Sequence, residues 1–305
     1  MSTTTSPPSG APSDVAGAAV PAPAAADVAR AVAIALAEDR SADDVTTSAT
    51  VPRGCVGRAE IVAREAGVVA GLPVADAVFR HALGDVVEIG TLVGDGGRVA
   101  TGQVLMTVRG DVACLLGAER SALNLLGHLS GIATATAAWV DAVADFGVTV
   151  RDTRKTTAGL RALEKYAVRC GGGVNHRLSL GDQALIKENH ILAAGSAAGA
   201  FEEVRARHPD VPVQVEVQTL DELTGVLRAG ATSVMLDNMS FAEMREAVRL
   251  TRGRARLEAS GRLRLADARR VASTGVDSVA IGELTHSARA LDVSMRLVDL
   301  AEGLP

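Results

Sequence analysis

Short apolar runs alternate with helix-capping signals in the second half of the chain, and this repeat constrains the fold more than any other feature. Strand-like runs lie at 148–150, 213–217, 232–237, 255–260 and 277–282. Between them, Thr219 with Glu222 and Ser240 with Glu243 have the spacing of capping boxes, and Gly230 is a typical helix stop. Repeated strand and helix units of this kind predict an α/β fold with a parallel barrel.

The first half has a different pattern. A helix is predicted at 28–38, and short alternating runs separated by glycines at 56–109 indicate a small antiparallel sheet. Residues 112–142 are apolar and almost free of helix breakers, which predicts a long helix or a helix pair that bridges two domains. We therefore expect the domain limits that follow: a flexible Ala/Pro-rich tail at 1–27, an α/β sandwich at 28–128 onto which 290–305 packs back, and a barrel at 129–289.

The composition of the chain argues against several classes of function and location. The chain carries 31 Lys/Arg and 36 Asp/Glu, and aromatic residues make up 2%. A net charge of −5 and so few aromatic residues argue against nucleic-acid binding. No apolar run reaches the roughly 18 residues of a membrane helix, and the first residues lack the charged start of a secretory signal. Three widely spaced cysteines fit a reducing compartment, so we expect a soluble cytoplasmic protein.

One segment reverses the acidic balance. Residues 151–190 hold eight Lys/Arg against four Asp/Glu, which leaves 23 against 32 in the rest of the chain. A compact cluster of cations in an acidic protein predicts a small and strongly anionic ligand.

Charged residues and glycines also follow the predicted strands. In a parallel barrel the functional groups lie at the carboxyl ends of strands, so these positions should converge on one face. The positions concerned are Arg154, Lys155, Lys187, Glu216, Asp237, Ser260, Gly261 and Gly282. Any one of the cations could be an ordinary solvated loop charge, but their shared placement favours a site.

Two carboxylates form a candidate metal pair. Glu216 could point outward from its strand and Asp237 could simply begin a turn, but together they offer the hard oxygen ligands that suit Mg²⁺. Ser260, Gly261 and Gly282 could hold a phosphate through backbone N–H groups. Arg154 and Arg177 have the forked donors that match carboxylates, whereas a histidine such as His176 is more often packed than catalytic.

At these residues the chain resembles quinolinate phosphoribosyltransferase, the carboxylating nicotinate-nucleotide pyrophosphorylase. The matching segments, found between about 28 and 300, are RDTRKT, ALEKYAVRCGGGVNHR, ALIKENHI, EV, LDN, ASG, IGELTHSARALD, DDVTT, EAGVVAGL and AERSALNLLGHLSGIAT. The resemblance implies a small α/β sandwich and an incomplete barrel, in a homodimer or hexamer with the active site at the interface.

The resemblance also implies a reaction and roles. Quinolinate and 5-phosphoribosyl 1-diphosphate would give nicotinate mononucleotide, CO₂ and diphosphate in NAD biosynthesis. The residues that would surround both reactants are Arg154, Lys155, His176, Arg177 and Lys187. Arg120 would come from the neighbouring subunit. Glu216 and Asp237 would hold Mg²⁺ and the ribose, and would act with Lys155 and Lys187 in catalysis. Ser260, Gly261 and Gly282 would bind the 5-phosphate.

The chain departs from the family pattern at five positions, which are Ala158, Ser179, Gln214, Gln218 and Arg262. Gln214 and Gln218 alternate with Glu216, so we expect them to share its face and to reduce the negative charge near the metal. Arg262, where the family usually has glycine, could add a contact to the phosphate or block its close approach.

Alternative functions stay open at this stage. One is a related transferase that acts on another aromatic acid, as in molybdenum-transport-associated or specialised metabolism. Another is an aldolase-like lyase with Lys187 as the Schiff-base nucleophile. A third is a non-catalytic homologue, which would normally have lost some of the charged ligands.

Overall fold

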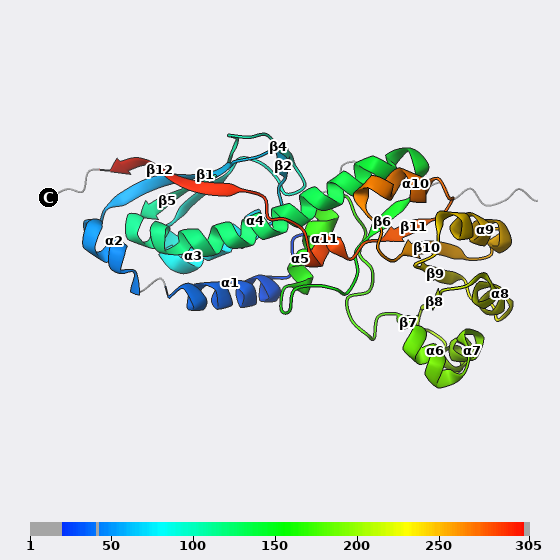
Figure 1. Ribbon diagram of the computed structural model, residues 1–305. Helices are drawn as coiled ribbons and strands as arrows, with labels where there is room; N and C mark the ends of the chain where they lie inside the picture. The colour runs from blue at the N-terminus through cyan, green and yellow to red at the C-terminus, as the bar shows by residue number, and fades with distance from the viewer. Residues whose placement is uncertain (1–19, 41–42, 302–305) are drawn as a thin grey trace, which may run out of the picture.

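The computed structural model describes residues 20–40 and 43–301 as an elongated molecule with two parts joined by a long helix (Figure 1). Residues 1–19 of the predicted tail and residues 302–305 lie outside the described residues.

The N-terminal part is built on a four-stranded antiparallel sheet with the order β12-β1-β5-β3. Its strands are β1 (Val56–Ala63), β3 (Glu88–Thr91), β5 (Val104–Asp111) and β12 (Val293–Ala301), and a small ribbon pairs β2 (Gly67–Val68) with β4 (Arg98–Val99). The helices are α1 (Ala25–Asp39), α2 (Val45–Thr50), α3 (Leu72–Leu83) and α4 (Val112–Val143). The last strand of the chain thus pairs with the first, and β12 runs back along β1 (Figure 1).

The barrel part holds a six-stranded parallel sheet with the order β6-β11-β10-β9-β8-β7. Its strands are β6 (Thr149–Arg151), β7 (Ala184–Ile186), β8 (Val213–Val217), β9 (Ser233–Asp237), β10 (Arg256–Ser260) and β11 (Ser278–Ala280). Its helices are α5 (Arg161–Cys170), α6 (Glu188–Ala194), α7 (Ala197–Arg207), α8 (Leu220–Arg228), α9 (Phe241–Thr251), α10 (Ala268–Ala272) and α11 (Glu283–His286). The two edge strands, β6 and β7, do not pair with each other in the described chain, so the barrel is open. The predicted fold class is confirmed.

Local sequence signals explain the helix starts in the barrel. Thr219 and Ser240 accept from the backbone N–H groups of Glu222 and Glu243, whose carboxylates accept in return from the backbone N–H of Thr219 and Ser240. These reciprocal bonds satisfy donors that a helix start leaves unpaired. Both predicted capping boxes are confirmed.

Helix α4 connects the two hydrophobic cores. It is one continuous helix of 32 residues, capped by the Asp111 side chain, rather than a helix pair. Its buried residues up to Ala137 belong to the N-terminal core, and from Trp139 they belong to the barrel core. Helix α5 also packs in the N-terminal core, through Leu163 and Tyr166. We keep the limits 28–128 and 129–289 as a prediction, in which α4 and α5 are shared elements.

The sequence predicted a sheet throughout residues 56–109, but the structure has a helix, α3, within this range. Gly71 takes φ 102° at the start of this helix, and Pro73 lies in its first turn, where a missing N–H has no cost. Val78 and Phe79 are fully buried in the N-terminal core. A helix buries this apolar face against α4, which contacts it extensively.

Candidate active site

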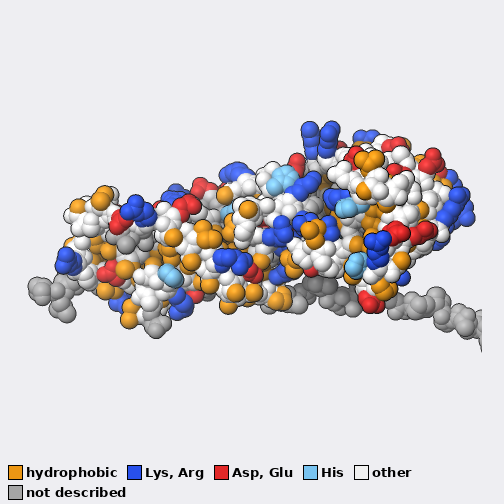
Figure 2. Space-filling view, turned by 90° about the horizontal axis from the view of Figure 1, so that it is seen from below, with side chains coloured by type: hydrophobic (Ala, Val, Ile, Leu, Met, Phe, Trp, Pro, Cys, Tyr) orange, Lys and Arg blue, Asp and Glu red, His pale blue; other side chains and the backbone are white. Residues whose placement is uncertain are grey.

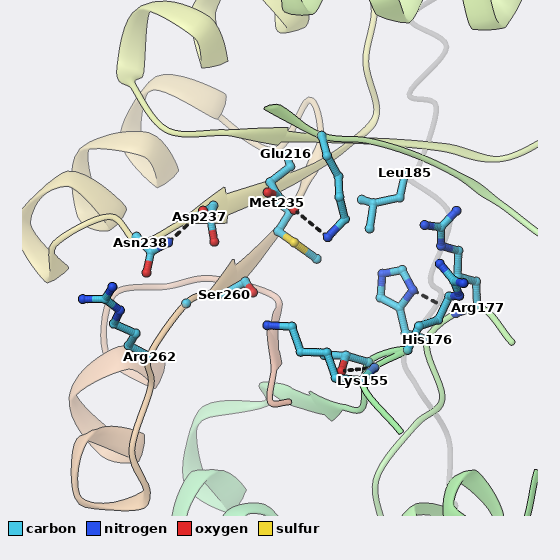
Figure 3. A pocket seen from close by; sticks show the side chains of 14 residues that line it. Lys155, His176, Arg177, Leu185, Glu216, Met235, Asp237, Asn238, Ser260 and Arg262 are labelled. Atoms are coloured by element: carbon cyan, nitrogen blue, oxygen red, sulfur yellow. Dashed lines mark hydrogen bonds and ion pairs between the residues drawn. The ribbon is translucent and has the colours of Figure 1, made fainter. Parts of the chain in front are cut away.

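A cavity of about 530 Å³ opens at the carboxyl ends of the parallel strands (Figure 3). The lining residues come from the loops and strand ends of the barrel part, and they are Thr153, Arg154, Lys155, His176, Arg177, Leu185, Lys187, Glu216, Met235, Asp237, Asn238, Ser260, Gly261 and Arg262. Lys and Arg side chains gather around the middle of the molecule and over the barrel part in the view from below (Figure 2). The convergence predicted from the strand ends is therefore present.

Nine of the predicted site residues line this cavity, which we call the pocket. Gly282 lies beside it, because a Cβ at that position would be 3.2 Å from Lys155 Cδ. Arg120 does not line the pocket and instead borders a second cavity of about 310 Å³ between α1, α4 and residues 158–160. The sequence reasoning missed Thr153, Leu185, Met235 and Asn238, of which Asn238 follows a predicted strand end directly and could have been included.

Two arginines, Arg154 and Arg177, lie at one end of the pocket. The Nε atoms of Arg154 and Arg177 are both buried and have no hydrogen-bond partner among the described residues. Burial lowers the pKa of Arg177, and the neighbouring charge of Arg154 lowers it further. Two neighbouring like charges, each with a buried and unpaired Nε–H donor, form a strong anion site. We call Arg154, His176 and Arg177 the arginine end.

A buried network supports the arginine end from below. Asp152 and Lys165 form an ion pair at 2.5 Å with both side chains fully buried. Asp152 also accepts from the backbone N–H of His176 (2.7 Å) and from Asn175 Nδ2 (2.6 Å). Burial raises the pKa of Asp152 and lowers that of Lys165, and each charge opposes the shift of the other. Since the pair is closed by several hydrogen bonds, it fixes the loop that carries His176 and Arg177.

The opposite end of the pocket carries the carboxylates. Lys187 Nζ lies 3.5 Å from Glu216 Oε2, and Asp237 Oδ2 accepts from Asn238 Nδ2 at 2.8 Å (Figure 3). Asp237 Oδ2 also accepts from Gln218 Nε2 at 3.4 Å. Burial raises the pKa of Glu216, Lys187 lowers it, and Asp237 raises it again. We call Glu216, Asp237 and Asn238 the carboxylate end.

The donor set at the carboxylate end fits Mg²⁺ that is shared with a ligand. Two carboxylates and an amide oxygen are hard ligands, and Mg²⁺ commonly takes one or two protein carboxylates together with substrate phosphates. Within residues 20–40 and 43–301, no three His, Cys, Asp or Glu side chains are grouped as a metal site. A metal held here would thus need oxygens from the bound reactant.

Glycine is required at the turn after β10. Gly261 takes φ 95°, and a Cβ there would lie 2.8 Å from the backbone nitrogen of Asn238, so the turn tolerates no side chain. Asn238 and Arg262 take φ 55° and 48° on either side of it. Asn visits this region readily but Arg does not, so Arg262 holds a strained backbone at the rim of the pocket.

The expected placement of Gln214 beside the metal pair was wrong. Gln214 is buried, and its Oε1 lies 2.8 Å from His176 Nε2 while its Nε2 lies 3.4 Å from Glu258 Oε1. It shares the inward face of β8 with Glu216 but lies two residues deeper, below the arginine end. Gln218, by contrast, does contact the carboxylate end.

The fold and the pocket define an α/β-barrel enzyme that binds anionic reactants, with cations at one end and a carboxylate pair at the other. Models of the two domains of quinolinate phosphoribosyl transferase match the chain, the N-terminal domain at 44–130 and the C-terminal domain at 132–296. The protein belongs to the quinolinate phosphoribosyltransferase family.

Individual relatives agree with this assignment. The carboxylating nicotinate-nucleotide pyrophosphorylase of Mycobacterium leprae is 50% identical over 268 residues, which cover 86% of this chain and 94% of that protein. A probable enzyme of the same name from Synechocystis is 44% identical over 79% of this chain and 83% of its own. The solved structure of NadC from Streptococcus pyogenes is 41% identical, covers 91% of this chain and 99% of its own, and superposes with a TM-score of 0.86.

Proposed function

We propose that the protein transfers the phosphoribosyl group of 5-phosphoribosyl 1-diphosphate to quinolinate with loss of CO₂. The products are nicotinate mononucleotide, CO₂ and diphosphate, as used in pyridine nucleotide and NAD biosynthesis. The observation that carries the proposal is the pair of guanidinium groups of Arg154 and Arg177 in one pocket, each with a buried Nε–H that has no hydrogen-bond partner among the described residues. The family to which the chain belongs supports the same reaction.

The arginine end is the proposed acceptor site. Quinolinate has two adjacent carboxylates, and two forked guanidinium groups can each bind a carboxylate through paired hydrogen bonds. An acid with one carboxylate would leave one of the two buried Nε–H donors unpaired, which is costly. Arg154 and Arg177 therefore favour a dicarboxylate over other aromatic acids.

The carboxylate end is the proposed donor site. Glu216 and Asp237 would hold Mg²⁺, which supplies neutralising charge to the diphosphate when bound. Ser260 and Gly261 would bind the 5-phosphate through the turn that requires glycine, and Gly282 leaves room for Lys155 to approach. Lys155 and Lys187 would stabilise the charge that develops on the departing diphosphate.

The chemistry needs positioning more than it needs a protein nucleophile. As the bond from ribose C1 to diphosphate breaks, its electrons leave with diphosphate, and the nearby carboxylates favour the cationic sugar that forms. The pyridine nitrogen of quinolinate then donates its lone pair to C1. The resulting pyridinium accepts the electrons left on the ring when the 2-carboxylate departs as CO₂, and a solvent proton replaces it. The arginine end holds the nitrogen towards C1 during these steps.

The alternative of an imine-forming lysine is weaker. Lys187 is 47% exposed and faces the Glu216 carboxylate, whereas a Schiff-base lysine must be unprotonated, commonly in an apolar or cation-rich pocket. Borohydride in the presence of a carbonyl compound should therefore leave no covalent adduct at Lys187.

We also propose a homodimer or hexamer in which Arg120 of one subunit completes the pocket of the next. In support, Arg120 lies at a cavity apart from the pocket of its own chain. Mixing Arg120→Ala with Arg177→Ala protein under exchange conditions should restore activity, because a mixed pair contains one intact site. No recovery would show that Arg120 acts within its own chain.

The proposed location is the cytoplasm. Cys55, Cys114 and Cys170 are all free thiols, as is usual in a reducing compartment. No helix of the described chain has both the length and the apolar character needed to cross a bilayer.

The decisive test is a direct assay of the purified protein with quinolinate, phosphoribosyl diphosphate and Mg²⁺. Nicotinate mononucleotide and CO₂ should appear in equal amounts, and nicotinate as sole acceptor should give little product. Turnover of nicotinate but not quinolinate, or of another acid from a panel of aromatic acids, would overturn the proposal.

A further inference from the structure

His176 is the most constrained residue of the pocket, because each of its polar groups already has a protein partner. Its backbone N–H donates to Asp152 Oδ1 (2.7 Å), and its carbonyl oxygen accepts from Lys165 Nζ (2.9 Å). In the ring, Nδ1 lies 2.8 Å from the backbone nitrogen of Arg177, and Nε2 lies 2.8 Å from Gln214 Oε1. With the residue 5% exposed, a molecule in the pocket meets ring carbons rather than a free ring nitrogen.

The hydrogen bonds assign the proton of the ring. The backbone N–H of Arg177 is a donor, so Nδ1 accepts with its lone pair and carries no proton. The proton of the neutral imidazole then lies on Nε2, which donates to Gln214 Oε1. The amide NH₂ of Gln214 is thereby turned toward Glu258 Oε1, at 3.4 Å. Every donor along this chain of side chains meets an acceptor only when His176 is neutral.

Glu258 is the last residue in this series of hydrogen-bonded side chains. Its Oε2 accepts from Arg151 Nη1 (2.8 Å) and Ser278 Oγ (3.0 Å). Burial raises the pKa of Glu258, but the nearby His176 ring, whose Nε2 is 3.5 Å away, the charge of Arg151 and the hydrogen bond from Ser278 outweigh burial, so this pKa lies below its ordinary value. The carboxylate is therefore an anion beneath the arginine end.

Charged groups of both signs surround His176, and it is the hydrogen bond from the Arg177 N–H that opposes a second proton at Nδ1. The anions near it are Asp152 at its backbone and Glu258 of β10, whose Oε1 is 3.5 Å from Nε2. The cations are more numerous and come from β6, α5 and the pocket loops, namely Arg151, Arg154, Lys155, Lys165, Arg177 and Lys187. A proton added at Nδ1 would also face the Arg177 N–H.

We propose that Gln214 is a positioning residue that holds His176 as the neutral imidazole protonated on Nε2. In that form His176 orients Arg177 through its backbone N–H, and it neither gives nor takes a proton in the reaction. The kinetic consequence rests on the proposed function, whereas the position of the ring proton is a property of the protein alone.

The ring proton can be located directly by nitrogen-15 NMR of the full chain. Comparison with the His176→Asn variant identifies the signals of His176 among those of the six histidines. At pH 8 the spectrum should show a protonated Nε2 and an unprotonated Nδ1. A proton on Nδ1 would overturn the proposal.

Gln214→Glu gives a second test, because it keeps the shape and adds a buried charge opposite Glu258. Two carboxylates this close resist joint ionisation, so the cluster should take up a proton as the pH falls toward neutrality. Quinolinate affinity, measured by calorimetry, should be roughly tenfold weaker than wild type at pH 8 and approach wild type at pH 6, since the protonated cluster regains the wild-type charge. Wild-type affinity should be flat over this range.

Gln218→Glu is the matched control, since Gln218 lies at the end of the same strand but contacts Asp237. It should leave the His176 spectrum and the pH profile of quinolinate binding unchanged. A flat profile for Gln214→Glu, or the same change in Gln218→Glu, would overturn the role of Gln214. Should Gln214→Glu not fold, Gln214→Met must shift the Nε2–H signal, because the amide acceptor is lost.

The two proposals can fail separately. If the ring proton lies on Nε2 and quinolinate does not bind at any pH, the acceptor is wrong while the role of Gln214 in fixing the ring stands.

Discussion

The two ends of the pocket differ in how firmly their residues are held. At the arginine end, a fully buried ion pair and hydrogen bonds of 2.6–2.9 Å hold His176 and Arg177. At the carboxylate end, the contacts between residues of separate strands are 3.4 and 3.5 Å long. The arginine end is therefore preformed in the protein without a ligand. The second end has carboxylates whose mutual repulsion still has to be neutralised. This difference indicates that the proposed acceptor site is rigid and that the proposed donor site would be completed by its reactant and metal.

Removal of the buried charge below the arginine end should have the largest effect. Asp152→Asn leaves Lys165 without its counter-ion, so we expect a loss of about 3–5 kcal/mol in the free energy of unfolding. Urea unfolding measures this. Asp141→Asn, which breaks an exposed ion pair with Arg98, should cost less than about 1 kcal/mol. Equal losses in the two variants would contradict the buried support.

Loss of one guanidinium at the arginine end should change the kinetic constants for quinolinate much more than those for phosphoribosyl diphosphate. Arg177→Ala should lower kcat/KM for quinolinate about 100-fold, as expected when charge-assisted hydrogen bonds are lost. KM for phosphoribosyl diphosphate should change far less, because its site is at the carboxylate end. Arg228→Ala, at the exposed end of α8, should leave both constants unchanged. Equal effects on both reactants would remove the distinction between the ends.

The anion that anchors the arginine end predicts a pH dependence of stability. The pKa of Glu258 is lowered from its ordinary value of 4.5, so its stabilisation is present above that pH and is lost as the pH falls through the lowered pKa. Glu258→Gln should therefore be less stable than wild type by about 2 kcal/mol at pH 7, with a gap that narrows in acid. Unfolding series from pH 3 to 8 measure the gap. A gap that does not vary with pH would mean that the charge of Glu258 contributes nothing.

The smallest expected effect lies at the rim of the carboxylate end. Arg262→Gly relieves a left-handed backbone and should add about 1 kcal/mol of stability. Because a cation is lost beside the donor site, KM for phosphoribosyl diphosphate should rise about threefold. Arg252→Gly is the matched control, since Arg252 has φ 50° at the end of α9 and does not line the pocket. It should gain the same stability with an unchanged KM.

The sequence predicted the elements of the barrel because their signals are local. The capping boxes at Thr219 and Ser240 and the strand at 213–217 depend on residues a few positions apart, and all three are present as predicted. Helix α3 was missed because its glycine and proline punctuation resembles that of a turn, and its burial against α4 is a tertiary effect.

The pocket residues were predictable because parallel strands bring their carboxyl ends together. The supporting network was not, since Asp152 lies 24 residues from His176, and Arg151 lies 107 residues from Glu258. One signal was available: Glu258 is a charged residue within a short apolar strand, and a charge in such a place needs a buried partner. The identity of that partner depends on packing, which the sequence pattern does not specify.

Calorimetric titration of quinolinate into the protein, without phosphoribosyl diphosphate or Mg²⁺, tests the preformed arginine end most directly. We expect quinolinate to bind the protein alone, and nicotinate, which has one carboxylate, to bind at least tenfold more weakly. Quinolinate binding that appears only after donor and metal are added, or nicotinate binding of equal strength, would contradict the account.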